Sequence, residues 1–262
     1  MERVTWSVDA GVADVRLARP EKLNAVDAAM LDALVDVAGR VADDAAVRVV
    51  VLSGEGRGFC SGLDLSLFDV VAAGGAAAGA GPKGRPLGER AQRAVRVWSE
   101  LAVPVIAAVH GPALGAGLEL ALAADLRVVA PDAQLGAIEI RWGMVPDMTA
   151  TQLLPRLVGM DVAKELVLTG RTVTGEEAVR LGLATRAAEH PRDAAMALAG
   201  EIAGKNPAAV RAAKHLLDLA GTAPLAVGLR AERETMESLV GTPNQVEAMR
   251  AYRESRPARF ED

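Results

Sequence analysis

The chain has 262 residues, of which 51% are hydrophobic and 3% aromatic, and its formal net charge at pH 7 is −5. This length allows one large domain or a core with a small appendage, and the core must be built mainly from alanine, valine and leucine. No block of lysine or arginine stands out, so composition gives no support for a nucleic-acid-binding face. We therefore predict no nucleic-acid partner.

Other classes of protein are excluded by what the sequence lacks. Cys60 is the single cysteine and there are 3 histidines, so no intrachain disulfide can form and a Cys/His zinc site is not expected. No signal-peptide pattern is visible, and no charge-free apolar run reaches about 18 residues. We expect a cytoplasmic protein with no metal and no membrane span.

The first part of the chain alternates strands with helices. Residues 4–8 and 12–17 are predicted to form a hairpin that turns at Asp9-Ala10-Gly11. Asp27 is placed to cap a helix that runs to about Val41. The β-branched run at residues 48–53 predicts a buried strand.

Two glycine-rich turns each follow a predicted strand, about 50 residues apart. The first is GEGRGFCSG at residues 54–62. The second is HGPALGAGLE at residues 110–119, which follows an apolar strand at 103–109 and leads into a helix at 118–124. Glycine lets backbone N–H groups approach a ligand closely, and the start of a helix adds unpaired N–H groups. Each turn could supply one donor to an oxyanion hole, which needs two donors that converge from different segments.

Glu119 is the one ionised side chain between His110 and Asp125. A lone buried carboxylate costs several kcal/mol, so it needs either a partner or a raised pKa and a chemical task. The alternative is that the glycines only allow close packing of the helix start against neighbouring backbone, and that Glu119 lies at a subunit contact. The turn matches neither a Walker A loop nor a dinucleotide-binding fingerprint.

The rest of the chain becomes increasingly helical. Residues 71–88 are rich in alanine and glycine and are expected to be a surface loop that could act as a lid. A helix at 89–101 and a strand at 126–129 flank the central turn. A mixed segment at 132–145 and a turn at 146–148 follow, and Thr149 is expected to cap a helix through Leu157. The further predicted helices cover residues 162–168, 175–181, 192–203, 207–219, 224–239 and 244–254. We predict a catalytic core over 1–191 and a helical oligomerisation region over 192–262.

Several motifs in order resemble the crotonase (enoyl-CoA hydratase/isomerase) superfamily over essentially the whole chain. They are RPEKLNA, GFCSGLDL and PVIAAVHGPALGAGLELALAADLR, followed by residues 134–152, Lys205-Asn206-Pro207 and AYRESRPARF. The resemblance implies an α/β fold, a spiral of ββα units with a C-terminal helical trimerisation region. It also implies a homo-trimer, or a hexamer made of paired trimers.

The resemblance implies an acyl-CoA site. The thioester oxygen would sit between the backbone N–H groups of Leu63 and Ala116, and the two hydratase carboxylates would be Glu119 and Glu139. Coenzyme A is then part of the substrate, and no separate cofactor is implied. The further positions implied in CoA or substrate binding are Lys22, Ala25, Ser61, Gly62, Asp64, Leu65, Gly115 and Gly143. A basic residue common just beyond Leu65 is replaced by Ser66, and Lys22 is the candidate substitute for phosphate contacts.

One departure from the hydratase pattern leaves the reaction open. Hydratases usually carry glycine where this chain has Asp147, whereas dienoyl-CoA isomerases, which it resembles in having three active-site carboxylates, hold an acid there. Those isomerases usually have aspartate at the position of Glu119. Our first hypothesis is an enoyl-CoA hydratase that uses Glu119 and Glu139. The alternatives are a double-bond isomerase that also uses Asp147, and a non-catalytic acyl-CoA- or RNA-binding relative.

Other polar residues have simpler interpretations. Glu139 could instead be an exposed charge at a strand end, and Asp147 an ordinary turn residue. The pattern around Cys60 and Ser61 is not the G-x-S-x-G nucleophile elbow, so no covalent nucleophile is expected. His110 is expected to pack or to form hydrogen bonds. By resemblance, Asp125 and Arg127 are expected to form a structural ion pair.

Overall fold

The computed structural model describes residues 2–67 and 86–262. The loop predicted at 71–88 therefore lies outside the described residues except at its end, where Leu87 and Gly88 begin a helix. The strands are β1 (Val4–Asp9), β2 (Val12–Leu17), β3 (Val49–Gly54), β4 (Val105–Val109), β5 (Pro112–Leu114), β6 (Leu126–Val129), β7 (Gln134–Gly136), β8 (Val173–Thr174) and β9 (Arg186–Ala187).

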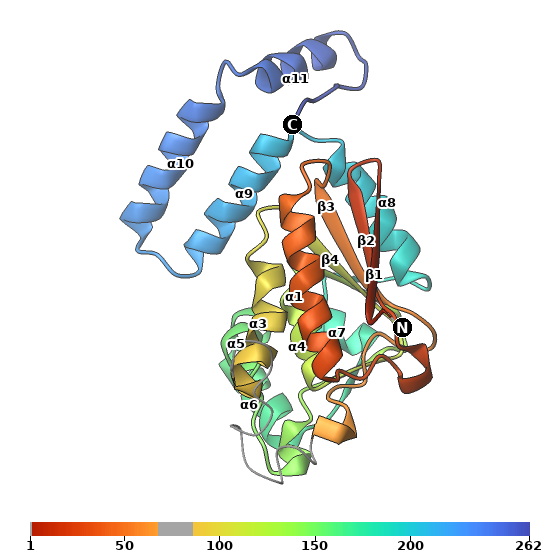
Figure 1. The fold of residues 1–262 in the computed structure, drawn as a ribbon. Coiled ribbons are helices and arrows are strands. Elements are labelled where there is room, and N and C mark those ends of the chain that lie inside the picture. Colours follow the sequence, from red (N-terminus) through yellow and green to blue (C-terminus); the bar gives the residue numbers. More distant parts are fainter. Residues whose placement is uncertain (1, 68–85) are drawn as a thin grey trace.

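Helices dominate the second half of the chain, as predicted (Figure 1). They are η1 (Pro20–Lys22), α1 (Ala28–Asp43), α3 (Leu87–Ser99), α4 (Ala116–Leu122), η4 (Glu139–Trp142), α5 (Ala150–Val158), α6 (Met160–Thr169), α7 (Gly175–Leu181), α8 (Pro191–Ala203), α9 (Pro207–Ala220), α10 (Leu225–Leu239) and α11 (Pro243–Arg253).

The main sheet has six strands in the order β1-β2-β3-β4-β6-β9. The predicted hairpin is confirmed: β1 and β2 pair antiparallel with Val4 opposite Leu17, and Ala10 and Gly11 take the positive φ values that a tight hairpin turn needs. The remaining neighbours pair in parallel. A second, smaller sheet has the order β5-β7-β8.

Both faces of the main sheet are covered. In β3, Val50 and Leu52 belong to the large hydrophobic core that includes side chains of α1 and α3, whereas Val49 and Val51 pack with side chains of α8. Successive residues of a strand point to opposite faces, so an unbroken apolar run is what a sheet buried on both sides requires. Figure 1 shows α1 and α8 on opposite sides of the sheet.

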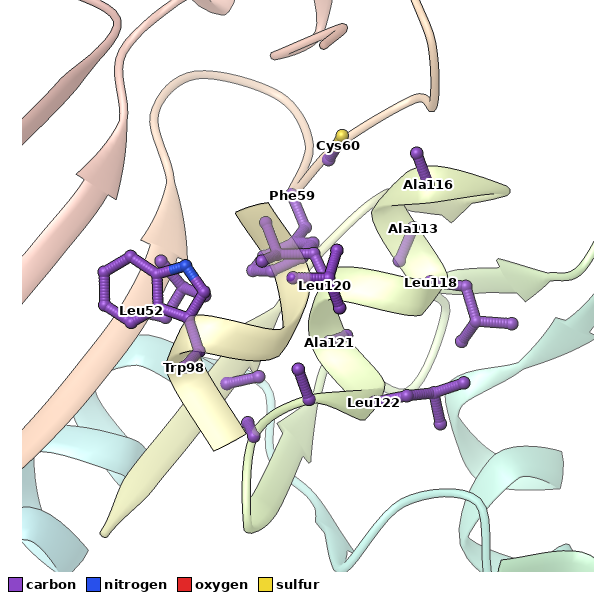
Figure 2. Packing of buried hydrophobic residues seen from close by; sticks show 14 of the residues in the cluster. Leu52, Phe59, Cys60, Trp98, Ala113, Ala116, Leu118, Leu120, Ala121 and Leu122 are labelled. Carbon is purple, nitrogen blue, oxygen red and sulfur yellow. The ribbon is translucent and has the colours of Figure 1, made fainter. Parts of the chain in front are cut away.

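The helix predicted after Asp27 is confirmed as α1. The Asp27 side chain accepts a hydrogen bond of 2.8 Å from the backbone N–H of Met30, which is the contact of an N-cap. Beyond α1, the core continues between the sheet, α3 and α4. Figure 2 shows Leu52, Trp98 and Leu120 among the buried side chains there. This packing fixes α4, which carries the second glycine turn at its start.

The last helices extend away from the sheet. α9 and α10 lie side by side, α11 follows beyond the C-terminal end of α10, and the chain then returns to end near the start of α9 in Figure 1. Asp262 near the end of the chain forms ion pairs of 2.7 Å with Arg48 and 3.0 Å with Arg211. The domain boundary at residue 192 stays a prediction. α8, which lies on the C-terminal side of that boundary, packs on the main sheet. Among the described residues, no helix combines the length and hydropathy needed to cross a bilayer.

Two local predictions were wrong. Asp125 forms no direct ion pair with Arg127, although its charge opposes the lowering of the Arg127 pKa by burial. The Asp125 carboxylate accepts hydrogen bonds from Lys214 at 2.8 Å and from the N–H of Val105 at 2.7 Å. The Arg127 guanidinium donates instead to backbone carbonyls, including that of Leu183 at 2.8 Å. Thr149 does precede α5, but its side chain forms no capping hydrogen bond.

Candidate active site

The two glycine turns meet at one edge of the sheet. β3 and β4 are parallel neighbours, with Leu52 opposite Ala107, so the turns that follow them leave the same edge. Cys60 then pairs with the β5 segment: its N–H donates to Pro112 at 2.9 Å, and its carbonyl accepts from Leu114 at 3.1 Å. The two turns that were each predicted to supply one donor therefore lie side by side.

Glycine is required where these turns touch. A Cβ at Gly117 would overlap the carbonyl oxygen of Cys60, and a Cβ at Gly111 would overlap the carbonyl oxygen of Arg57. At Gly62, where φ is +106°, a Cβ would lie 2.9 Å from the carbonyl oxygen of Leu114. The glycines therefore serve the close approach of one turn to the other.

Two backbone N–H groups at this junction are left unpaired. In the bridge between Val26 and Leu63, Val26 donates to Gly62 at 2.8 Å and Asp64 donates to Val26 at 2.9 Å, so the N–H of Leu63 points away from the bridge. Ala116 is the first residue of α4, where helical N–H groups have no partner in the helix. Within residues 2–67 and 86–262, no carbonyl or side chain accepts from either group.

A cavity of about 710 Å³ lies over these N–H groups. Its wall includes every predicted site residue: Lys22, Ala25, Ser61, Gly62, Leu63, Asp64, Leu65, Gly115, Ala116, Glu119, Glu139, Gly143 and Asp147. The other lining residues are mostly apolar: Leu87, Gly88, Ala91, Leu114, Ile138, Trp142, Met144, Val145 and Met148. The structure thus gathers residues from five separate segments around one space.

Glu119 is buried in α4, with 1% of its surface exposed, yet its carboxylate reaches the cavity. Its Oε1 atom accepts hydrogen bonds from the backbone N–H groups of Met148 at 2.9 Å and Ala150 at 3.1 Å. Burial, and then the nearby charge of Glu139, raise the pKa of Glu119 to about 8, although the two N–H donors oppose this shift. A carboxyl with this pKa can hold or release a proton near neutral pH.

Glu139 begins η4 and is also buried, with 9% exposed, so it is not the exposed strand-end charge considered as an alternative. Neither of its carboxylate oxygens has a hydrogen-bond partner among the described residues. Burial, and to a smaller extent the charge of Asp147, raise its pKa, although the backbone N–H of Glu139 itself opposes this shift. Gly115 makes room for it, since a Cβ there would lie 3.0 Å from Glu139 Oε1.

Asp147 is the third acid in the cavity wall. Burial of its carboxyl within the site raises its pKa, and its charge in turn raises the pKa values of Glu119 and Glu139. The described residues contain no group of three His, Cys, Asp or Glu side chains placed to hold a metal ion. The arrangement is suited to moving protons between carboxyl groups and a ligand.

A polar cluster joins the loop after β2 to the first glycine turn. Arg19 Nη1 donates to Asp64 Oδ2 at 2.5 Å and to the carbonyl of Ala25 at 3.0 Å. Asp64 Oδ1 accepts from the hydroxyl of Ser66 at 2.7 Å, and these contacts, Ser66 first, lower the pKa of Asp64 to about 2. Ser66, which stands where a basic residue was expected, therefore holds Asp64. Leu65 between them is 68% exposed at the cavity rim.

Comparison with known proteins identifies the family. The sequence profile described as Enoyl-CoA hydratase/isomerase matches residues 7–262. The chain belongs to this family. It is 35% identical over 264 residues to the mouse (Mus musculus) Enoyl-CoA hydratase domain-containing protein 2, mitochondrial, covering 95% of this chain and 84% of that protein. It is 32% identical over 259 residues to the Short-chain-enoyl-CoA hydratase of Clostridium acetobutylicum, covering 98% and 96%.

The enoyl-CoA hydratase/isomerase fold is confirmed by solved structures. The crystal structure of the enoyl-CoA hydratase from Bacillus anthracis superposes with a TM-score of 0.88 at 31% identity, covering 98% of each chain. The protein is therefore an enzyme of the enoyl-CoA hydratase/isomerase family with the crotonase-type α/β fold.

Two other polar side chains near the glycine turns, Cys60 and His110, are buried or hydrogen-bonded within the fold. Cys60 is fully buried, and burial raises the pKa of its thiol to about 12, so the thiolate is not populated near neutral pH. His110 forms a hydrogen bond of 2.9 Å with the carbonyl of Gly56, as its predicted hydrogen-bonding role requires. The prediction that neither Cys60 nor Ser61 is a covalent nucleophile stays a prediction.

Some parts of the site were not found from the sequence. The N–H groups of Met148 and Ala150, which bind Glu119, are backbone groups and leave no side-chain signal. The apolar wall residues Leu87 and Ala91 come from α3, which begins inside the loop predicted at 71–88. The helical spacing of Leu87, Ala91 and Ala94 was the signal that could have extended that helix.

Proposed function

We propose that this protein is an enoyl-CoA hydratase that adds water, with syn geometry, across the double bond of a 2-enoyl-CoA thioester. The observation that carries the proposal is the pair of buried carboxyl groups, Glu119 and Glu139, in one cavity with two unpaired N–H groups. The Short-chain-enoyl-CoA hydratase of Clostridium acetobutylicum, 32% identical to this chain, supports the same reaction.

The N–H groups of Leu63 and Ala116 would bind the thioester oxygen. Adding water to carbon 3 of the enoyl group places negative charge on that oxygen, and two fixed donors stabilise this charge without reorganising during the reaction. Because both donors belong to the backbone, replacing either side chain does not remove its donor. The donors depend on the packing between the two glycine turns.

Glu119 and Glu139 would handle the protons. One carboxylate takes a proton from the attacking water, and the other carboxyl group delivers a proton to carbon 2. Because the two groups interact, they titrate as a pair, and the active form carries one proton between them. Delivery of the hydroxyl and the proton from one side of the ligand gives syn addition.

The coenzyme A moiety would lie along the first glycine turn. Asp64 and Leu65 would meet the adenine, and Lys22 would meet a phosphate. Ala25, Ser61 and Gly62 would line the path to the thioester, with Gly115 and Gly143 nearer the acyl group. All of these residues line the cavity, which supports this placement. No separate cofactor is proposed.

The proposal is tested with crotonyl-CoA, whose conjugated thioester absorbance disappears on hydration. We expect the wild-type protein to remove this absorbance, and Glu119→Gln and Glu139→Gln each to lower kcat by about 100- to 10,000-fold, the usual range for a general acid or base. Full activity in either variant would contradict the assignment. Binding of coenzyme A without turnover of any enoyl-CoA would instead indicate the non-catalytic relative.

Isomerisation of an enoyl- or dienoyl-CoA is the second candidate, because Asp147 adds a third acid to the cavity. In that reaction Glu119, Glu139 and Asp147 would move a proton between the ends of a conjugated system, with no water added. Asp147→Asn separates the two candidates. It should abolish an isomerase and leave hydration of crotonyl-CoA within a fewfold of wild type.

Assembly as a homo-trimer, or a hexamer, is proposed through the C-terminal helices. α10 contains no buried residue, and its Leu225, Leu229 and Met236 side chains are each more than half exposed. Light scattering should give three or six times the mass of the chain. A cytoplasmic location also stays a prediction, and the mouse relative is named as a mitochondrial protein.

A further inference from the structure

Gln92 lies on α3, outside the cavity wall, and contacts the active site through one peptide group. Its side-chain amide Nε2 donates a hydrogen bond of 2.8 Å to the carbonyl oxygen of Asp147. The N–H group of the same peptide belongs to Met148 and donates to Glu119 Oε1 at 2.9 Å. The Asp147–Met148 peptide is therefore held at its oxygen by Gln92 and uses its N–H group to hold Glu119.

The turn that carries this peptide needs such support. Thr149 has a φ of 95°, a left-handed conformation that costs a β-branched residue free energy. This conformation lets the N–H groups on either side of Thr149, those of Met148 and Ala150, converge on one oxygen. The Thr149 hydroxyl is buried without a hydrogen-bond partner among the described residues, so it does not fix the turn.

We propose that Gln92 is a positioning residue for Glu119, which it orients through the Asp147–Met148 peptide. The inference rests on the proposed function of Glu119 as one of the two proton-transfer groups. A hydrogen bond to the carbonyl oxygen polarises the peptide and strengthens the donor at its N–H end. Without Gln92, the peptide can rotate, its N–H moves away from Glu119, and the carboxylate loses one of its two donors.

The charges around Glu119 make this role measurable. Among the described residues, the acids that act on Glu119 are Glu139 from η4 and Asp147 from the turn before α5. Gln92 is neutral, so replacing it with another neutral side chain leaves these charges unchanged. Any change in the titration of Glu119 then reports the hydrogen bond. Loss of a donor to the carboxylate destabilises the ionised form and raises its pKa.

The test compares Gln92→Met, which keeps the side-chain length and removes the donor, with Gln152→Met as a matched control. Gln152 is exposed on α5, and among the described residues its amide donates to its neighbour, the Thr151 hydroxyl, at 3.2 Å. We expect Gln92→Met to lower kcat for crotonyl-CoA by about two- to tenfold, the range set by one net hydrogen bond. It should also move the alkaline limb of the pH–rate profile upward by roughly half a pH unit. Gln152→Met should change neither.

A second readout separates this inference from the proposed function. Nuclear magnetic resonance of protein labelled with carbon-13 at glutamate carboxyls follows the titration of Glu119 without substrate, with Glu119→Gln to assign its signal. We expect a higher midpoint in Gln92→Met than in wild type. A wild-type protein that hydrates no enoyl-CoA would refute the proposed function and leave this titration as the test of the link. An unchanged Glu119 midpoint in folded Gln92→Met would overturn the inference. This holds even if kcat falls, when the variant differs from wild type otherwise only in lower thermal stability.

Discussion

The carbonyl oxygen of Cys60 occupies the space that a Cβ atom at Gly117 would need. This contact brings the two glycine turns together and so sets the spacing between the N–H groups of Leu63 and Ala116. Gly117→Ala must push the turns apart. We expect it to lower kcat by about 100- to 1000-fold, as loss of one oxyanion donor does, and to cost about 1–3 kcal/mol of stability through overpacking.

Gly39→Ala is the control for this substitution. Gly39 lies inside α1, and nothing lies within 4 Å of a Cβ built there. It should retain full activity and gain about 0.5–1 kcal/mol in stability from better helix propensity. Wild-type kcat in a folded Gly117→Ala protein would show that the contact does not set the donor geometry.

Gly115→Ala should act on the acid/base pair. Gly115 has a φ of +51°, and an added Cβ would lie 3.0 Å from Glu139 Oε1, so the carboxylate must move. A misplacement of about 1 Å in a proton-transfer group can lower the rate by about 100-fold, so a smaller shift of Glu139 should still lower kcat by several-fold. We expect a fall in kcat with little change in the binding of coenzyme A, measured by calorimetry. A kcat equal to that of wild type would argue against a catalytic role for Glu139.

The raised pKa of Glu119 predicts how stability depends on pH. Its pKa is about 8 in the folded protein and about 4.5 ordinarily. Between these values the folded state holds a proton that the unfolded chain has released. The contribution of this group to stability is therefore lost as the pH rises from about 5 to about 8. Glu119→Gln removes this effect, so its free energy of unfolding, relative to wild type, should increase over the same range. Urea unfolding of both proteins at each pH measures this difference in free energy of unfolding. A difference that does not change with pH would contradict the raised pKa.

Lys22 is expected to contribute to the binding of coenzyme A and not to the chemistry. It is exposed at the cavity rim, where one charge contact with a phosphate is worth up to about 1 kcal/mol. Lys22→Ala should raise KM about two- to fivefold and leave kcat unchanged, and the difference should shrink at high salt. Lys164→Ala, at an exposed lysine on α6 outside the cavity wall, is the control. Equal KM values for Lys22→Ala and wild type would remove Lys22 from the site.

Local sequence signals predicted the longer elements well. Three predicted features depend only on residues that are close in the chain, and each is observed. They are the β1–β2 hairpin, the Asp27 cap of α1 and the apolar strand β3. The strands β8 and β9 have 2 residues each, which is too short for any periodicity to appear. The partner of Asp125 is Lys214, 89 residues away, and no local pattern encodes such a contact.

The site was predicted mainly because its motifs resemble those of a family. Reasoning from residues alone left Glu139 and Asp147 open to ordinary surface roles. Thr149 does not act as the expected cap, because its φ of 95° lies outside the extended region in which an N-cap side chain reaches the N–H groups of the first turn. Glu119, from a different segment, accepts the N–H of Ala150 at the start of α5. Spacing along the chain could not reveal that link, because it depends on the turn around Thr149.

The most direct test of the hydratase proposal is a mass spectrum of crotonyl-CoA after incubation with the enzyme in heavy water. The proposal predicts that one molecule of heavy water is added, with deuterium at carbon 2, and that Glu119→Gln and Glu139→Gln both abolish the addition. Uptake of deuterium without added water would contradict hydration and favour the isomerase. An unchanged spectrum with crotonyl-CoA and with longer enoyl-CoA substrates would contradict hydration.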